Sequence, residues 1–467
     1  MFKGKGKSVA TYASVEDTAP FADHDKAEDD GMVDEETLSS SSPPSSRKGG
    51  DSEEADEDEY ILVDPTKQQT ATATSCTFNL VNNIIGGGVL ALPFALKTSG
   101  IFLGSFLLCL VGALSAYSCQ LLISASSRVE TKSYRAIAAA CYGRKGAIML
   151  DLSMVLFIFG ALTGYMIIVG DVLTPFTGFL GPLDTRAFVV AVAMLTVMLP
   201  LSLLTKVDKL KYTSILALAC ILYLVGVVSF HGVKHVWDKS VKESLEDLHL
   251  MRFTVGVFTS IPIICFSFTF HPNIFPIFGE MKNATRRRMQ RVVFSSSAFC
   301  GIVYVVVGVL GYITFAEETE GNIFTNYNDN TAVEVGKILL AVIICVSYPL
   351  LHYAARLHLD ELLVEIFGEA RLPDIRWRYI VITILYALLS YGLSILMPDI
   401  AIVFSLVGAT AGNIIVFIAP GMMYVRLMPG RLRSPKKIGA LTLAVLGALF
   451  GVISVVVTIV EDVAGKL

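Results

Sequence analysis

Long stretches without charged side chains most restrict how this chain of 467 residues can fold. A helix of about 20 apolar residues spans the hydrocarbon core of a bilayer, and helices satisfy their own backbone groups there. The mean hydropathy of +0.63 is too high for a soluble domain of this length. We therefore expect an all-α polytopic membrane protein with eleven transmembrane helices. The predicted spans are 72–96, 101–124, 146–170, 187–205, 212–230, 253–279, 292–315, 334–355, 379–396, 400–425 and 438–460.

The basic residues between the spans predict the orientation of the chain. With a cytosolic amino terminus, the cytosolic connections hold 22 Lys and Arg residues, and all non-cytosolic segments from residue 71 onward hold 8. Cytosolic loops are expected to carry this excess. The odd number of spans then places the carboxyl terminus on the non-cytosolic side.

Residues 1–70 differ in composition from the remainder of the chain. They contain 18 acidic and 7 basic residues and few large aliphatic ones, a composition typical of disordered segments. We expect a disordered acidic cytosolic tail over 1–70, followed by a transmembrane domain over 71–467. A partner of this tail would be a trafficking or signalling protein.

The first span contains three consecutive glycines within "FNLVNNIIGGGVLALPF". Each glycine costs a helix interior about 1 kcal/mol relative to alanine, so the run predicts an unwound backbone at membrane depth. Polar residues precede it along one helical face. This face consists of Ser75, Asn79, Asn82 and Gly86. Hydrogen bonding to a neighbouring helix is the alternative explanation for these polar side chains.

The sixth span contains a second interruption, in "FSFTFHPNIFPIF". Pro272 and Pro276 each remove a backbone donor and disfavour helix before them. His271 lies beside this break, either as a functional group or as a neutral packing residue. Broken helices at corresponding positions of two five-span sets indicate an inverted-repeat transporter with its site near the bilayer midplane.

Four motifs resemble those of the amino acid/auxin permease family, which includes sodium-coupled neutral amino acid transporters and fungal vacuolar amino acid transporters. They occur in order within 72–460, on spans one, three, six and ten. They are "FNLVNNIIGGGVLALPFALKTSG", "YMIIVGDVL", "FHPNIFPIFGEM" and "SLVGATAGNIIVFIAPGMMY". The resemblance implies the fold of the bacterial leucine transporter, an inverted 5+5 repeat with broken helices 1 and 6, plus an eleventh helix.

The resemblance also implies a set of substrate-binding residues. The amides of Gly86, Gly87 and Gly88 would hold the substrate carboxylate, and carbonyls from Phe268 to Phe270 would face its amino group. Other predicted binding residues from the same spans are Asn82, Tyr165 and His271.

The coupling ion is either sodium or a proton, and we expect no other cofactor. Asn82 and Ser347 match positions that hold sodium in coupled relatives, although that second position is usually threonine there. Proton coupling would rely largely on His271, because the central parts of the spans contain no Asp or Glu.

These features predict a secondary active transporter of neutral amino acids rather than an enzyme, in a plasma or vacuolar/lysosomal membrane. The expected partners are the amino acid and membrane lipid, and no nucleic acid. A sensor that binds an amino acid and signals through its tail is the alternative function.

Overall fold

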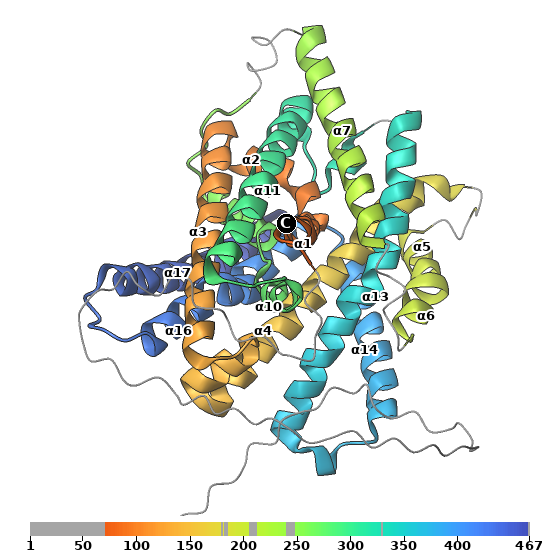
Figure 1. Ribbon diagram of the computed structural model, residues 1–467. Coiled ribbons are helices and arrows are strands. Elements are labelled where there is room, and N and C mark those ends of the chain that lie inside the picture. Colours follow the sequence, from red (N-terminus) through yellow and green to blue (C-terminus); the bar gives the residue numbers. More distant parts are fainter. Residues whose placement is uncertain are drawn as a thin grey trace, which may run out of the picture. The chain divides into compact units, whose positions relative to one another are not determined.

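The computed structural model describes residues 71–178, 181, 185–204, 213–239, 248–327 and 330–465. The predicted tail at 1–70 lies outside the described residues. The regular secondary structure of the described ranges is helical (Figure 1), apart from an isolated bridge between Ala71 and Met281. This confirms the predicted all-α fold class.

The first span is broken at its glycines, as predicted. Helix α1 (Ala73–Ile84) is followed by a short 3-10 helix η1 (Gly87–Ala91) and by α2 (Leu92–Ser99). The two parts are bent by 49°. Gly86, between them, has an extended backbone with φ −110° and ψ −156°, so the helical hydrogen-bond ladder stops there.

The sixth span is also broken. Helix α9 (Val257–Ser267) ends before three non-helical residues, and the chain continues as η6 (His271–Asn273) and α10 (Ile274–Glu280). Proline at the start of η6 supplies no backbone donor.

The remaining spans are single helices or helices with local irregularities. The fourth span comprises α5 (Arg186–Ala193), η4 (Met194–Met198) and α6 (Leu199–Ser202). The tenth comprises α15 (Ile400–Val407), η9 (Gly408–Gly412), η10 (Ile414–Ile418) and α16 (Ala419–Leu427). The others are α3 (Ile101–Val129), α4 (Tyr134–Leu173), α7 (Thr213–Lys239), α11 (Arg286–Phe315), α13 (Thr331–Phe367), α14 (Ile375–Leu396) and α17 (Pro435–Gly465).

Within the described residues, nine helices are long and apolar enough to cross a membrane. The bent segment made of α1, followed by η1 and α2, gives a tenth span. Arg186–Ser202 is a shorter apolar helix. The total of eleven spans stays a prediction that depends on this short helix. The predicted separation of spans nine and ten agrees with the gap between α14 and α15.

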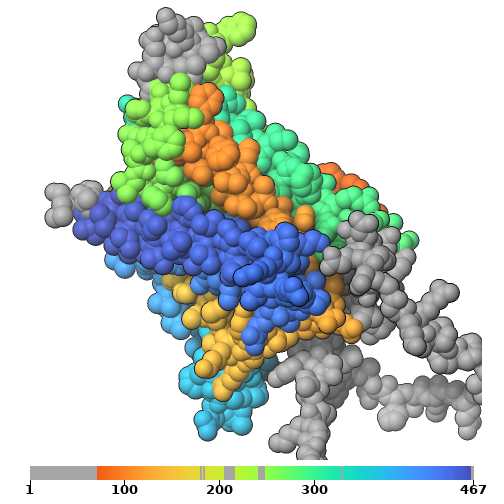
Figure 2. Space-filling view, turned by 90° about the vertical axis from the view of Figure 1, so that its left-hand side faces the viewer, coloured from red at the N-terminus to blue at the C-terminus, as the bar shows by residue number. Residues whose placement is uncertain are grey.

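The broken helices lie inside the helical assembly, and the peripheral helices expose more apolar surface. In the most apolar 18-residue stretch of Val257–Glu280, which contains α9 and α10, 78% of the residues are buried. The corresponding share is 33% in α7, α14 and α17. Figure 2 shows α17 as a dark blue band across one face, where it packs on α9, α15 and α16. Helices α4 and α13 pack extensively against each other.

We name the two ends by the predicted orientation. The predicted cytosolic face carries the start of α1 and the connection from α10 to α11. The predicted non-cytosolic face carries the short helix α12 (Ile323–Asn326), which packs against η1 and α4.

Candidate functional site

The two helix breaks lie against each other, although about 180 residues separate them in the sequence. A Cβ atom placed on Gly88 would lie 2.5 Å from Oγ of Ser267 and 3.1 Å from its Cα. The backbones can approach this closely only because Gly88 has no side chain. The two breaks predicted from the sequence therefore lie at one place in the structure.

Tyr304 of α11 contacts both breaks through its hydroxyl group. Its Oη lies 2.6 Å from the carbonyl oxygen of Ile84 and 3.1 Å from that of Ser267. One O–H donor is thus shared between the last turns of α1 and α9. The tyrosine is fully buried, so its hydroxyl satisfies carbonyl groups that water would otherwise have to reach.

Gly86 and Gly87 differ in their surroundings. A Cβ on Gly86 would have no heavy atom within 4 Å. A Cβ on Gly87 would lie 3.1 Å from Ile168, 3.5 Å from Tyr165 and 3.7 Å from Phe404. Gly87 also begins η1, where the first N–H groups have no partner within the helix. The N–H of Gly86 already donates to the carbonyl of Ile84 at 2.9 Å. The open space beside the amides of Gly87 and Gly88 suits a carboxylate.

Aromatic rings line the same region. Phe266 of α9 and Phe404 of α15 are stacked with centroids 4.0 Å apart, and Phe157 of α4 lies 5.2 Å from Phe266. Phe404 also faces Gly87 and Gly164. Phe404 and Tyr304 were not predicted from the sequence, because their roles depend on contacts between spans.

Phe268 and Phe270 are fully buried. The Phe268 ring packs edge-on against Tyr304, with centroids 5.1 Å apart. The backbone carbonyl of Phe268 accepts from the N–H of Phe270, and the backbone carbonyl of Phe270 accepts from the N–H of Asn273. Each carbonyl keeps a second lone pair for an ammonium group, so the predicted contribution comes from the backbone rather than the side chains.

His271 is fully buried and faces α3. Its Nε2 lies 3.2 Å from Oγ of Ser118, and that hydroxyl donates to the carbonyl of Val416 in η10. Its Nδ1 has no hydrogen-bond partner among the described residues. The side chain thus fits a packing role between α3 and the tenth span.

The predicted sodium ligands lie on α1 and α13. Oδ1 of Asn82 is buried and has no hydrogen-bond partner in the described part of the chain, while Ser347 is half-buried. Helix α1 packs on α11, α10 and α7. No close packing of α1 on α13 occurs within the described ranges. A sodium site made by Asn82 and Ser347 stays a prediction.

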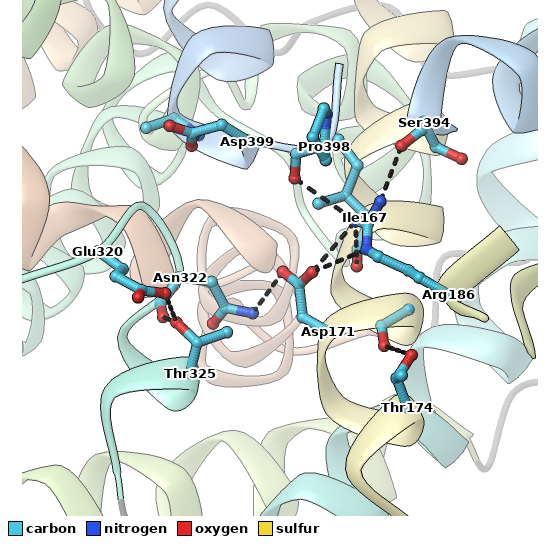
Figure 3. A network of polar contacts seen from close by, with 12 residues as sticks. Ile167, Asp171, Thr174, Arg186, Glu320, Asn322, Thr325, Ser394, Pro398 and Asp399 are labelled. Atoms are coloured by element: carbon cyan, nitrogen blue, oxygen red, sulfur yellow. Dashed lines mark hydrogen bonds and ion pairs between the residues drawn. The ribbon is translucent and has the colours of Figure 1, made fainter. Parts of the chain in front are cut away.

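A polar network closes the predicted non-cytosolic end (Figure 3). Oδ1 of Asp171 accepts from Nε of Arg186 at 3.2 Å and Nη2 at 3.1 Å. Its Oδ2 accepts from Nδ2 of Asn322 at 3.1 Å. Arg186 also donates to the carbonyls of Ser394 and Pro398. The network therefore joins α4, α5, the α14–α15 connection and the segment that enters α12.

Helix α12 is held over the first break by this network. Oδ1 of Asn322 caps α12 by accepting from the N–H of Phe324, and α12 packs on η1. Asp399 lies in the connection between α14 and α15. Burial raises the pKa of the Asp399 carboxyl, and the negative charge of Glu320 raises it further.

A family model described as transmembrane amino acid transporter protein matches residues 69–460, which is most of the chain. The chain belongs to this amino acid transporter family. The match confirms the resemblance to amino acid/auxin permeases and makes the chain a multi-pass membrane transporter rather than an enzyme.

Curated relatives of the transporter carry related names. Vacuolar amino acid transporter 5 of Schizosaccharomyces pombe is 29% identical over 361 residues, covering 75% of this chain and 83% of the relative. Amino acid transporter AVT6E of Arabidopsis thaliana is 28% identical over 394 residues, covering 80% of each chain. Solute carrier family 38 member 10 of Homo sapiens is 27% identical, but the match spans 32% of its length.

Solved structures confirm the fold of the transporter. MhsT in complex with L-phenylalanine aligns with a TM-score of 0.52 at 13% identity, covering 84% of this chain and 100% of that one. The inward-facing conformation of Mhp1 aligns with a TM-score of 0.53 at 12% identity, covering 86% and 93%. Both have the leucine-transporter fold, as the resemblance to amino acid/auxin permeases implied.

Proposed function

We propose that the protein is a secondary active transporter that moves neutral amino acids by alternating access. The observation that carries the proposal is the pair of adjacent breaks, with an open space at Gly86 and stacked Phe266 and Phe404 nearby. The amides after the first break suit a carboxylate, and the carbonyls of the second suit an ammonium group. No charged side chain belongs to this described set, which favours an uncharged substrate side chain.

The accessibility of α1 supports alternating access. Cys76, Leu80 and Ile84 are buried on one face of this helix. Asn79 and Asn82 on the other face are partly accessible, and Asn83 is exposed. At the opposite end, α12 covers η1. This arrangement corresponds to a carrier that is closed at the predicted non-cytosolic face and accessible from the predicted cytosolic face.

We further propose coupling to a sodium or proton gradient. Sodium would use Asn82 and Ser347, which closure of α1 against α13 would bring together. Proton coupling through His271 is less favoured by its packing against Ser118. The name of the fission yeast relative supports a vacuolar-type membrane. The fission yeast and Arabidopsis relatives are named as transporters, which supports transport over the sensor alternative.

The test is uptake of radiolabelled neutral amino acids into proteoliposomes that contain the purified protein, with sodium or proton gradients imposed in parallel. Accumulation driven by one gradient is the expected result and names the ion. A Ser347→Ala variant should lose sodium-driven uptake selectively if sodium is that ion. Binding of an amino acid without uptake under either gradient would overturn the proposal.

A further inference from the structure

A group of charged side chains at the predicted cytosolic ends of α4 and α13 lies apart from the two breaks. Arg135 Nε lies 2.7 Å from Oδ2 of Asp151, and its Nη2 lies 2.8 Å from Oε2 of Glu365. Arg144 Nε lies 3.2 Å from Oε1 of Glu365. With Glu361, 3.6 Å from Arg135 Nε, three carboxylates face two guanidinium groups. Asp360, which also acts on Glu361, is paired with Arg378 at 2.9 Å. Among the described residues, the group therefore lacks one positive charge.

Two unpartnered atoms face each other inside this group. Asp151 is fully buried, and its Oδ1 has no hydrogen-bond partner among the described residues. Nδ1 of His358 on α13 also has none, and it lies 3.4 Å from that oxygen. A lone pair on Nδ1 would repel the carboxylate, whereas an N–H there would donate to it. The geometry therefore favours a proton on Nδ1, which the neutral Nδ1–H tautomer and the imidazolium both carry. The missing positive charge of the group favours the imidazolium.

We propose that His358 and Asp151 form a proton-binding site that fills from the predicted cytosolic side. The proton binds to the imidazole, whose Nδ1–H then donates to Oδ1 of Asp151. Its charge balances the three carboxylates against the two guanidinium groups. Glu361 Oε2 lies 3.9 Å from the same Nδ1, and its side chain is 51% exposed, so it links the site to water.

A metal ion fits this site less well than a proton. One ligand atom each of Asp151, His358 and Glu361 lies within 4.8 Å of the others. However, the guanidinium of Arg135 already lies against both carboxylates and remains charged at every relevant pH. A divalent cation would leave an excess positive charge in the group.

The proton site is connected to the tenth span through the first part of α4. Arg135 lies before the kink at Gly143, where φ is 61°. In the same part, the hydroxyl of Tyr134 donates to the carbonyl of Ile415 at 2.7 Å, and Arg426 donates to the carbonyl of Cys141 at 2.7 Å. Protonation therefore strengthens an attachment that links α13 to η10 and α16, and cytosolic pH would set its strength.

The experiment measures the melting temperature of the purified full chain between about pH 8 and pH 5.5, the range in which an ordinary histidine titrates. His358→Gln mimics the neutral ring, so position 358 should add little to the melting temperature at any pH in this range. His358→Lys carries a permanent charge, so it should raise the melting temperature equally at every pH. The unmodified protein should resemble His358→Gln at pH 8 and His358→Lys at pH 5.5, a relative gain of about 2 °C.

A second histidine provides the matched control. His249 Nε2 lies 3.5 Å from Glu317, but both oxygens of that carboxylate already accept from Arg252, unlike Oδ1 of Asp151. His249→Gln should therefore keep the pH response of the unmodified protein. An equal response in His358→Gln would overturn the proposal. So would a rise in melting temperature on adding Zn²⁺ at pH 8 that His358→Gln abolishes, because the site would then bind a metal ion. This assay detects no transport, so its outcome is independent of the proposed function.

Discussion

At the scale of single residues, the glycines of the first break act in different ways. Gly88 permits contact with Ser267, Gly86 borders open space, and Gly87 faces Tyr165 and Phe404. The sequence treats these neighbouring glycines alike, whereas the structure separates a packing role from a binding role. This separation leads to a prediction for Gly87.

Gly87→Leu should abolish efficient transport and leave the fold intact. The added side chain would meet Ile168 at 3.1 Å and would occupy the space beside the free amides. Overpacking of this kind costs roughly 1–3 kcal/mol, and a penalty of this size on substrate binding corresponds to about 5- to 150-fold in affinity. The measurement is the concentration dependence of uptake in proteoliposomes. Gly392→Ala on α14, outside both breaks, is the control and should keep near-normal affinity, because nothing lies within 4 Å of its new atom.

Tyr304→Phe should destabilise both breaks together. Removal of the hydroxyl leaves the carbonyls of Ile84 and Ser267 without this donor, at a cost of about 1–3 kcal/mol. The measurement is thermal unfolding combined with uptake. Tyr312→Phe on the same helix is the comparison, since that hydroxyl lies 3.4 Å from Glu317 and away from the breaks. Equal melting temperatures of Tyr304→Phe and the unmodified protein would contradict this account.

At the scale of helices, the sequence predicted the breaks because glycine and proline act on their own backbone. It did not predict what satisfies those breaks. Tyr304 and Phe404 come from other spans, and their spacing in the sequence carries no signal for these contacts. Asp171 was recognisable as an acidic residue near a span end, but its partners Arg186, at the start of α5, and Asn322, before α12, come from separate segments.

Asn322→Asp should loosen α12 without removing its helix cap. The new carboxylate can still accept from the N–H of Phe324, but it loses the donor to Asp171 and adds a like charge. Hydrogen bonds to charged groups contribute about 1.5–3 kcal/mol, so amide hydrogen exchange in α12 should become roughly 10- to 100-fold faster. Asn326→Asp makes the same change without contacting Asp171 and should have a smaller effect. Unchanged exchange in Asn322→Asp would refute the role of this contact.

At the scale of the whole molecule, the fold follows from the number, order and irregularities of the apolar spans. The alternation of basic connections adds a predicted orientation. Helix α7 projects beyond its neighbours at the top of Figure 1, on the predicted non-cytosolic side. Its end provides an accessible position for testing that orientation.

Asp238→Asn should create a glycosylated site near the end of α7. The substitution completes an N-x-S/T sequence with Lys239 and Ser240. The measurement is an electrophoretic shift, reversed by an endoglycosidase, after synthesis in microsomes. The unmodified chain is the control, because its Asn283-Ala284-Thr285 sequence lies on the predicted cytosolic face. An equal shift in the unmodified chain and the variant, which both carry Asn283-Ala284-Thr285, would reverse the orientation.

The shared hydroxyl of Tyr304 also affects how this carrier could acquire a new substrate preference. Its contacts with Ile84 and Ser267 make the two breaks energetically dependent on each other. Substitutions at the breaks should therefore be non-additive, and a change tolerated in one sequence background should be harmful in another. Substrate preference in such a site would evolve through paired substitutions rather than independent single steps.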